Sequence, residues 1–345
     1  MVLFLFLSLY FLCFCNAKTP PLYITVDGEI TTNNVNNPET ISSGALDTLR
    51  TQESLALQEL YTTLQGNTWR DSNYWMQNHP CGTKAKHYHD VWSGLQCNSQ
   101  RLVTDISLAA NQLRGTIPNV WTQLTQLKQL DLSLNHLKGA VPSSLGALKL
   151  LTRLDLGYNY LLLSLRHIGK LHRLQYLSLR WNTLITGSLL DLSSLTQLHT
   201  LILRDNQMES LTLEGIAPLT ALTTVDFTKS GLRGELDPAY LSGLIEFHAS
   251  NNRLSGTLFS LPSAATLSSL VVLDLSENML SGAIPRLKSA VNLKNLDLSN
   301  NAFVHNKLVL SEHVQLRTLK LNANRLEQPF FYDLYKLTHL EIFGK

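Results

Sequence analysis

One stretch of sequence recurs along this chain, and its clearest copy runs from Leu127 to Leu145. Written as a pattern it is LxxLxLxxNxLxGxxPxxL, with Asn135 at the asparagine position. A single copy is too short to bury its own leucines, so neighbouring copies must cover them. The pattern therefore predicts a stack of repeated turns rather than one large globular core.

Ten copies of the pattern follow one another at steps of 22 to 26 residues. Nine copies have asparagine at the marker position, and the sixth has Ser230 instead. This period is typical of leucine-rich repeats and predicts a solenoid of ten turns. The marker residues are Asn111, Asn135, Asn159, Asn182, Asn206, Ser230, Asn252, Asn278, Asn301 and Asn324.

Each copy begins with alternating leucines, as in Leu130-Asp131-Leu132, which predicts a short strand with its leucines inward. Stacked turns would pair these strands into one parallel sheet. The asparagine follows where the chain leaves the strand, and its amide both donates and accepts hydrogen bonds. Successive asparagines are therefore expected to form a ladder that satisfies buried backbone groups, while Ser230 satisfies fewer.

The N-terminus has the pattern of an export signal. Residues 2–14 are apolar, and the small residues up to Ala17 suit a signal peptidase. A membrane anchor is the alternative, but a spanning helix needs about 20 apolar residues. We therefore expect a cleaved signal peptide at residues 1–17 and a mobile leader at residues 18–44, which is rich in Thr, Asn and Pro.

Residues 45–101 are expected to form a cap over the first repeat. Apolar spacings of three and four predict a helix from about Asp47 to Leu64, with Ser42, Ser43 or Asp47 as its cap and Gly66 at its end. Three tryptophans follow at positions 69, 75 and 92. Once the signal is removed, Cys81 and Cys97 are the only cysteines, which predicts one disulfide in an oxidising compartment.

The repeats are expected to occupy residues 102–336, and residues 337–345 begin an eleventh turn. No cap sequence follows that turn within this chain. Two interpretations stay open: the chain is a fragment of a longer protein, or a partner covers the edge.

These motifs resemble the plant-type extracellular leucine-rich repeat family with its N-terminal cap. The repeats carry the resemblance together with Trp92-Ser-Gly94-Leu-Gln-Cys97, which is similar to the WxGVxC signature of that cap. The resemblance covers about residues 50 to 345, and the style of the cap around Tyr61 is closest to protist cell-surface members. It implies an α/β fold, namely a right-handed horseshoe solenoid with a parallel concave sheet that recognises a protein, peptide or glycan.

The sequence gives no pattern of a catalytic site, so we predict no enzyme and no cofactor. The segment containing His79, Cys81, His87, His89 and Asp90 has metal-ligand residue types, but Cys81 is better explained as a disulfide partner. A solvated loop without metal is therefore expected there. A net charge of +2 gives no concentrated basic face for nucleic acid.

Asp residues recur at one strand position of different turns. We expect them to face solvent as an acidic ladder that opposes self-association of the sheet. The recurring residues are Asp131, Asp155, Asp226, Asp274 and Asp297.

Repeats three to five differ from the other turns at positions expected to face solvent on neighbouring strands. Tyr, Trp and Arg are the types that dominate binding hot spots, so these repeats are the predicted ligand-binding patch. The alternative is that large side chains merely cover the sheet. The residues are Arg153, Asp155, Tyr158, Tyr176, Arg180, Trp181, Ile202, Arg204 and Asp205.

The leading hypothesis is an extracellular recognition module, secreted or on the cell surface, such as a receptor or adhesin ectodomain. A secreted inhibitor of a cell-wall-degrading hydrolase is the alternative. A third interpretation is a truncated membrane-receptor ectodomain, in which a membrane would be reached only through a C-terminal anchor missing from this chain.

Overall fold

The computed structural model divides into two units, Met1–Ile41 and Ser42–Lys345, and the described residues belong to the second. The predicted signal peptide, the leader up to residue 41, and His87 and His89 lie outside the described residues. No helix in the described part is long and apolar enough to cross a membrane. The described residues are 42–82, 90–206, 208, 211–258, 267–304, 313–326 and 337–344.

The predicted cap helix is α2, Ser43–Thr63, which begins earlier than the sequence indicates and includes two residues assigned to the leader. Ser42 is its N-cap, since the Ser42 hydroxyl accepts from the Ala45 N–H at 3.3 Å. The helix ends before Gly66: Gln65 adopts the left-handed conformation with φ 58°, and Gly66 opens the short 3₁₀ helix η1, Gly66–Thr68.

An aromatic cluster and a disulfide hold the cap together. The Trp75 ring centroid lies 4.8 Å from both the Trp69 and the Trp92 ring centroids. Cys81 and Cys97 form the expected disulfide, with their Cα atoms 5.9 Å apart. Because Cys97 ends strand β1, Leu95–Cys97, which pairs antiparallel with the first repeat strand, the disulfide fixes the cap to the sheet.

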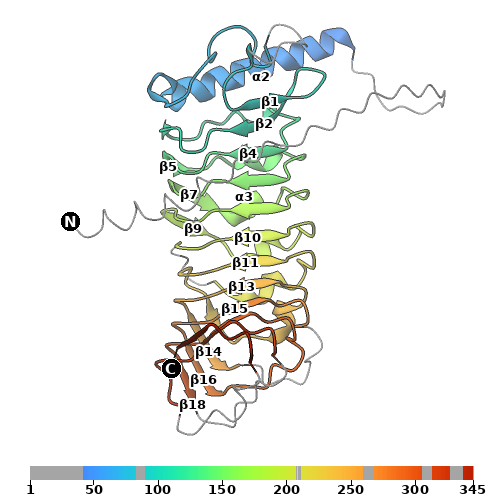
Figure 1. The fold of residues 1–345 in the computed structure, drawn as a ribbon. Coiled ribbons are helices and arrows are strands. Elements are labelled where there is room, and N and C mark those ends of the chain that lie inside the picture. The colour runs from blue at the N-terminus through green and yellow to red at the C-terminus, as the bar shows by residue number, and fades with distance from the viewer. Residues whose placement is uncertain are drawn as a thin grey trace, which may run out of the picture. The chain divides into compact units, whose positions relative to one another are not determined.

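The repeats build one twelve-stranded sheet that runs from β1 to β20 (Figure 1). All neighbouring strands after β1 are parallel, and β20 at the start of the eleventh turn pairs with β19. The repeat strands are β2 Val103–Ser107, β4 Gln129–Asp131, β6 Arg153–Asp155, β8 Tyr176–Ser178, β10 Thr200–Ile202, β11 Thr224–Asp226, β13 Glu246–His248, β15 Val272–Asp274, β17 Asn295–Asp297, β19 Thr318–Lys320 and β20 Ile342–Gly344.

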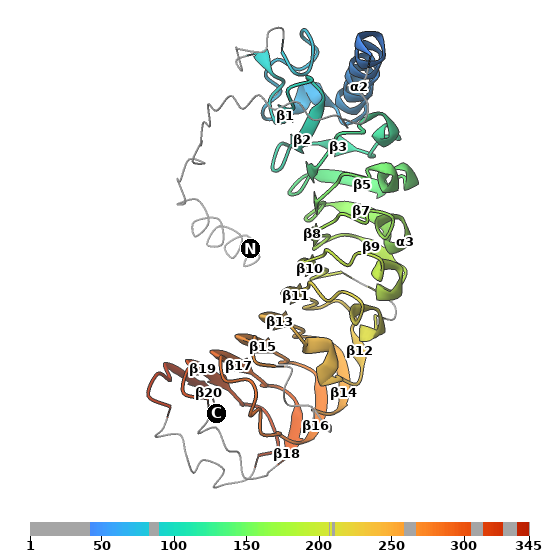
Figure 2. The ribbon, with the colours of Figure 1, turned by 90° about the vertical axis from the view of Figure 1, so that its right-hand side faces the viewer.

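Two four-stranded side sheets lie beside the large sheet. Repeats one to four form the first, and repeats six to nine form the second. The first side sheet contains β3 Arg114–Gly115, β5 His136–Ala140, β7 Tyr160–Ser164 and β9 Leu184–Thr186. The second side sheet contains β12 Arg233–Gly234, β14 Arg253–Thr257, β16 Met279–Ala283 and β18 Ala302–Val304. In the second unit, short helices lie on the side opposite the large sheet (Figure 2). They are η3 Trp121–Gln123, η4 Ser143–Ala147, α3 Leu165–Ile168, η5 Leu189–Leu192, η6 Leu213–Ile216 and η7 Pro238–Leu241.

The core is a column of leucines between these layers. Leu130, Leu154, Leu177 and Leu201 occupy the middle of successive strands, and each is fully buried. Each side chain lies on its counterpart in the next turn, which is the coverage that a single copy of the pattern lacks. The stability of each turn therefore comes from its two neighbours.

The asparagine ladder joins the turns through the backbone. The Asn135 Nδ2 donates to the carbonyls of Leu108 and Leu132 at 2.8 and 3.0 Å, and its Oδ1 accepts from the Asn111 and Leu113 N–H groups, both at 3.0 Å. Ser230 has only a hydroxyl, which donates to the Phe227 carbonyl at 2.6 Å. The asparagines thus satisfy backbone groups of two adjacent turns, whereas the Ser230 hydroxyl donates within its own turn.

Candidate functional site

Strands β6 and β8 align so that Arg153 lies beside Tyr176 and Asp155 lies beside Ser178. The Arg153 guanidinium carbon sits 3.7 Å from the centroid of the Tyr176 ring. The Tyr176 hydroxyl donates to the Asp155 carboxylate at 3.3 Å. Three residues of the predicted patch therefore form one connected group on the large sheet.

Five other patch residues do not lie on strands, because each strand ends after three residues. Tyr158, Arg180, Trp181, Arg204 and Asp205 occupy the turns that follow β6, β8 and β10. The expectation that they lie on strands was wrong, but Tyr158, Trp181 and Arg204 are exposed to solvent as expected. Ile202 is a true strand residue and ends β10, where it is half-buried.

The turn after each strand places one residue in the left-handed conformation, directly before the marker position. Tyr158, Trp181 and Asp205 have φ values of 56°, 53° and 54°. The Trp181 N–H donates to the Arg204 carbonyl of the next turn at 3.0 Å. This backbone geometry recurs in Ala110, Leu134, Tyr158, Trp181, Asp205, Lys229, Asn251, Glu277, Asn300 and Ala323.

Asp155 is not a solvent-facing group, since it is only 3% exposed. Its Oδ1 accepts from the Gly157 N–H at 3.0 Å. Burial raises the pKa of Asp155, and the bond from Gly157 opposes that rise. The predicted ligand contact at Asp155 is therefore replaced by a structural one, in which the carboxylate closes the turn and holds Tyr176.

The other recurring aspartates also close turns. Asp131, Asp274 and Asp297 each accept from the backbone N–H of the serine two residues later, at 3.0 Å. The hydroxyls of those serines donate to the same oxygens at 2.6 to 2.7 Å. This Asp-x-Ser arrangement is a local side-chain turn. It accounts for the recurrence of aspartate without an acidic ladder.

Repeats four and five lack the Asp-x-Ser turn. Ser178 and Ile202 stand where five of the turns have aspartate, and Arg180 and Arg204 stand where four of those five have serine or threonine. Repeats one, seven and ten also lack the aspartate, but only repeats four and five have arginine two residues later. A long guanidinium therefore extends over the sheet in each of these turns.

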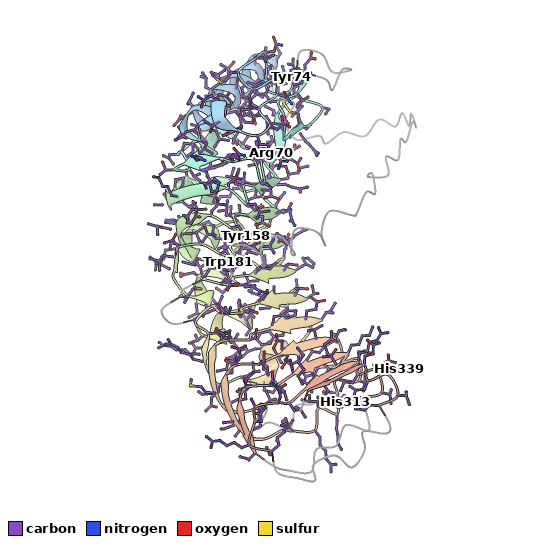
Figure 3. The ribbon with its side chains drawn as sticks, turned by 60° about the vertical axis from the view of Figure 1, so that its left-hand side comes forward. Arg70, Tyr74, Tyr158, Trp181, His313 and His339 are labelled. Carbon is purple, nitrogen blue, oxygen red and sulfur yellow. A yellow bond between two sulfur atoms is a disulfide. The ribbon has the colours of Figure 1, made fainter. Side chains whose placement is uncertain are left out.

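Tyr158, Arg180 and Trp181 form the aromatic corner, which lies in the turns that follow the strands of repeats three and four. Figure 3 labels Tyr158 and Trp181. The Tyr158 and Trp181 rings are stacked, with centroids 6.1 Å apart and an interplanar angle of 14°. The Arg180 guanidinium carbon lies 4.9 Å from the Tyr158 ring centroid. A Cβ at Gly157 would come within 2.9 Å of the Arg180 side chain, so the glycine makes room for it.

The three arginines of the patch differ in their pairing. Arg204 binds Asp205 at 2.9 Å and lies 3.9 Å from Asp226. Burial alone would lower the pKa of Arg204, but these two carboxylates raise it overall. No described carboxylate lies within 4.0 Å of Arg153 or Arg180. Their charges rest against aromatic rings instead, which leaves them available to an anionic group of a ligand.

Two residues of the segment with metal-ligand residue types, His79 and Cys81, contact each other within the cap. The His79 Nδ1 accepts from the Cys81 N–H at 3.1 Å, and Cys81 is in the disulfide. Burial, together with the charges of Arg101 and Arg50, lowers the pKa of His79 to about 4. Within the described ranges no three His, Cys, Asp or Glu side chains are grouped to hold a metal ion.

The family model described as Leucine rich repeat matches residues 101–161. The chain has the leucine-rich repeat fold. Over 74 residues this leucine-rich repeat chain is 35% identical to a probable leucine-rich repeat receptor-like protein kinase of Arabidopsis thaliana. That match covers 21% of this chain and 7% of the kinase, so the chain spans a small part of its curated relative.

Among the solved structures that match most of the chain are a receptor kinase and a plant ice-binding protein. The Arabidopsis receptor kinase HAESA, in complex with the peptide hormone IDA and the co-receptor SERK1, has a TM-score of 0.67 at 22% identity, covering 85% of this chain and 53% of HAESA. A plant ice-binding protein has a TM-score of 0.66 at 22% identity, covering 86% and 96% of the two chains. A hormone receptor and an ice-binding protein share this fold, so the likeness shows the fold alone.

Sequence reasoning missed two groups of residues. Glu53 in α2 is 1% exposed, although its helix position was not singled out. Tyr160 and Leu162 are exposed on β7 and alternate with buried Leu161 and Leu163. The sequence carries no such alternation, because residues 160–163 are all apolar, so it gave no signal of the exposed face of the first side sheet.

Proposed function

We propose that this chain is an extracellular recognition module that binds a protein or peptide ligand at the aromatic corner and the adjoining sheet. The observation that carries the proposal is the half-exposed Trp181 ring, stacked on Tyr158 beside an unpaired arginine. Tryptophan, tyrosine and arginine are the residues most often responsible for binding energy in protein interfaces.

The exposed aromatic pair, and not the backbone, distinguishes the corner from other turns. Leu134, Lys229 and Glu277 have the same left-handed conformation, so its cost of about 1 kcal/mol is common to the turns. Only at the corner does this position place two stacked aromatic rings in solvent, with Trp181 51% exposed.

The surrounding sheet makes the corner a preorganised surface. Tyr158 and Trp181 are held by backbone bonds to the next turn, at 2.7 Å from Tyr158 N to Arg180 O and 3.0 Å from Trp181 N to Arg204 O. Side chains fixed before binding lose little conformational entropy when a ligand arrives. The peptide-bound structure of HAESA, which shares the fold, motivates a peptide as the first ligand class to test.

The test is selection of peptides from a displayed random library, followed by affinity measurement with purified variants. Trp181→Ala is expected to weaken the selected peptides about tenfold or more, because hot-spot truncations cost about 2 kcal/mol. Asn300→Ala is the matched control, since Asn300 has the same backbone geometry in a distant turn. Equal affinity of the Trp181→Ala protein for every selected peptide would overturn the proposal.

A further inference from the structure

The first side sheet presents a face that the proposed function does not use. Its exposed strand residues are Arg114 on β3, His136, Lys138 and Ala140 on β5, Tyr160 and Leu162 on β7, and Leu184 and Thr186 on β9. None of these exposed residues is acidic. The face is basic over repeats one and two and apolar over repeats three and four.

The strand register places the two halves side by side. Lys138 pairs with Tyr160, so the basic half meets the apolar half at the boundary between β5 and β7. Leu162 pairs with Leu184, so two leucines lie next to each other on adjacent strands. Tyr160, Leu162 and Leu184 are 60%, 41% and 37% exposed, which is unusual for neighbouring apolar side chains on one sheet face.

The cations of the basic half have no carboxylate partner in the part of the chain that the structure describes. No described carboxylate lies within 4.0 Å of Arg114 or Lys138. Arg166, farther along the chain, lies 3.7 Å from Asp191, whose other oxygen accepts from the Ser188 N–H. That aspartate is therefore already bonded at the far end of the sheet, and the basic half keeps its charge.

The second side sheet provides an internal comparison. It has the same architecture, but Glu235 directly follows β12, and its carboxylate lies next to Gly256 of β14. Its remaining exposed side chains are mostly small, and Met279 stands without a paired large apolar residue, since its neighbour across the strands is Ser255. Separate basic and apolar halves are thus specific to the first side sheet.

We propose that the first side sheet is a second interface, which docks an extended segment of a partner protein with carboxylates at one end and apolar residues at the other. Four strands spaced about 4.8 Å apart span roughly 14 Å, which about four or five extended residues cover at roughly 3.3 Å each. Acidic residues would face Arg114 and Lys138, and apolar residues would cover Tyr160, Leu162 and Leu184.

The arrangement fits a protein segment better than a membrane. The charged and apolar residues follow one another across paired strands of one sheet face. A bilayer presents its charge and its apolar core at different depths, so a face that lies parallel to it brings only one half to the matching depth. A short segment with two unlike ends matches them in order.

The experiment uses the full chain and two labelled synthetic peptides. One has two acidic residues, a serine spacer and two apolar residues, and the other has lysines in place of the acids. We expect the acidic peptide to bind about tenfold or more tightly than the lysine peptide, with affinity that falls as salt rises. Equal binding of the two peptides would overturn the proposal.

Variants then locate the interface. Leu162→Ser is expected to weaken the acidic peptide about tenfold. Lys138→Glu is expected to remove most of the salt dependence. Met279→Ser is the matched control on the second side sheet, and Trp181→Ala tests the aromatic corner; both are expected to bind like the unmodified chain. Unchanged binding by Leu162→Ser, or loss of binding by Trp181→Ala instead, would overturn the inference.

Vesicles of phosphatidylglycerol and phosphatidylcholine provide the remaining arm. The face would be assigned to a membrane if these vesicles captured the chain more strongly than neutral vesicles, if Lys138→Glu removed that difference, and if the acidic peptide did not bind. That combination would overturn the inference. Equal urea midpoints for Leu162→Ser and the unmodified chain confirm that the variant is folded, because its side chain is exposed.

Discussion

At the scale of single residues, the marker asparagine makes hydrogen bonds that serine cannot reproduce. In Asn135→Ser, the hydroxyl could donate at most one hydrogen bond to a carbonyl of its own turn, as the Ser230 hydroxyl does to the Phe227 carbonyl. It would leave the Asn111 and Leu113 N–H groups without their acceptor. We expect a loss of about 2 to 4 kcal/mol in unfolding free energy, because two buried donors become unsatisfied.

Urea denaturation measures that loss, and His136→Ser is its control because the exposed His136 adjoins the same turn. A loss below about 1 kcal/mol for Asn135→Ser would show that the ladder is not a main source of stability.

The residue pattern also shows what sequence can and cannot predict about the site. The residue types of Arg153, Tyr176 and Trp181 marked repeats three to five, since they depart from a regular pattern. The pattern did not show that Asp155 is buried, because aspartate in an Asp-x-Gly or Asp-x-Ser turn reads like any solvent-facing strand residue. Nor did it show where each strand ends, since alternation continues through the left-handed turn residue.

At the scale of elements, α2 places a buried carboxyl against the first repeat. The Glu53 Oε2 accepts from the Val103 N–H of β2 at 3.0 Å, and its Oε1 is buried without a hydrogen-bond partner. Burial raises the pKa of Glu53 to about 7, against an ordinary value of 4.5, and the Val103 bond opposes part of this rise. The folded cap therefore holds a proton more tightly than the unfolded chain.

Stability of the cap should consequently depend on pH. Because the pKa of Glu53 is higher in the folded state, its favourable contribution is complete below about pH 4.5 and is lost as pH rises through about 7. The change is on the order of 2 kcal/mol. His79 of the same cap acts in the opposite direction, because its pKa is lowered to about 4 and its contribution is lost as pH falls below about 6.5. Thermal unfolding of the unmodified chain and of Glu53→Gln between pH 4.5 and 8 therefore isolates the Glu53 part as the difference between the two curves, which should change with pH. Glu59→Gln, an exposed change on the same helix, should follow the unmodified chain; a difference between the Glu53→Gln and unmodified curves that is the same at every pH would contradict this assignment.

The elements themselves were largely predictable. A period near 24 residues and the leucine alternation specify the large sheet, and apolar spacing specifies the cap helix. The side sheets were not predicted, because their strands are formed by two to five residues whose pairing depends on the preceding stack. The helix end was predicted to within one residue, at Leu64 against Thr63, but the residue that follows in the left-handed conformation is Gln65 and not a glycine.

At the scale of the whole molecule, each turn of the solenoid contacts only its neighbours, so local unfolding at one end should stay near that end. The disulfide joins the loop at Cys81 to β1, which pairs with the first repeat strand. A bridge with a sequence separation of 16 residues contributes about 3 kcal/mol in the chain-entropy model. Its removal should therefore weaken the cap and the first turns while later turns keep their protection.

The combined change Cys81→Ser and Cys97→Ser tests this without leaving a free thiol, and hydrogen exchange read by mass spectrometry localises the effect. We expect exchange about two orders of magnitude faster over residues 43–107, since opening becomes about 3 kcal/mol easier there. Residues 267–304 should exchange at the original rate, because many independent neighbour contacts separate them from the cap. Equal acceleration in both regions would mean that the turns unfold as one cooperative body, and ligand binding at repeats three to five would then depend on the cap.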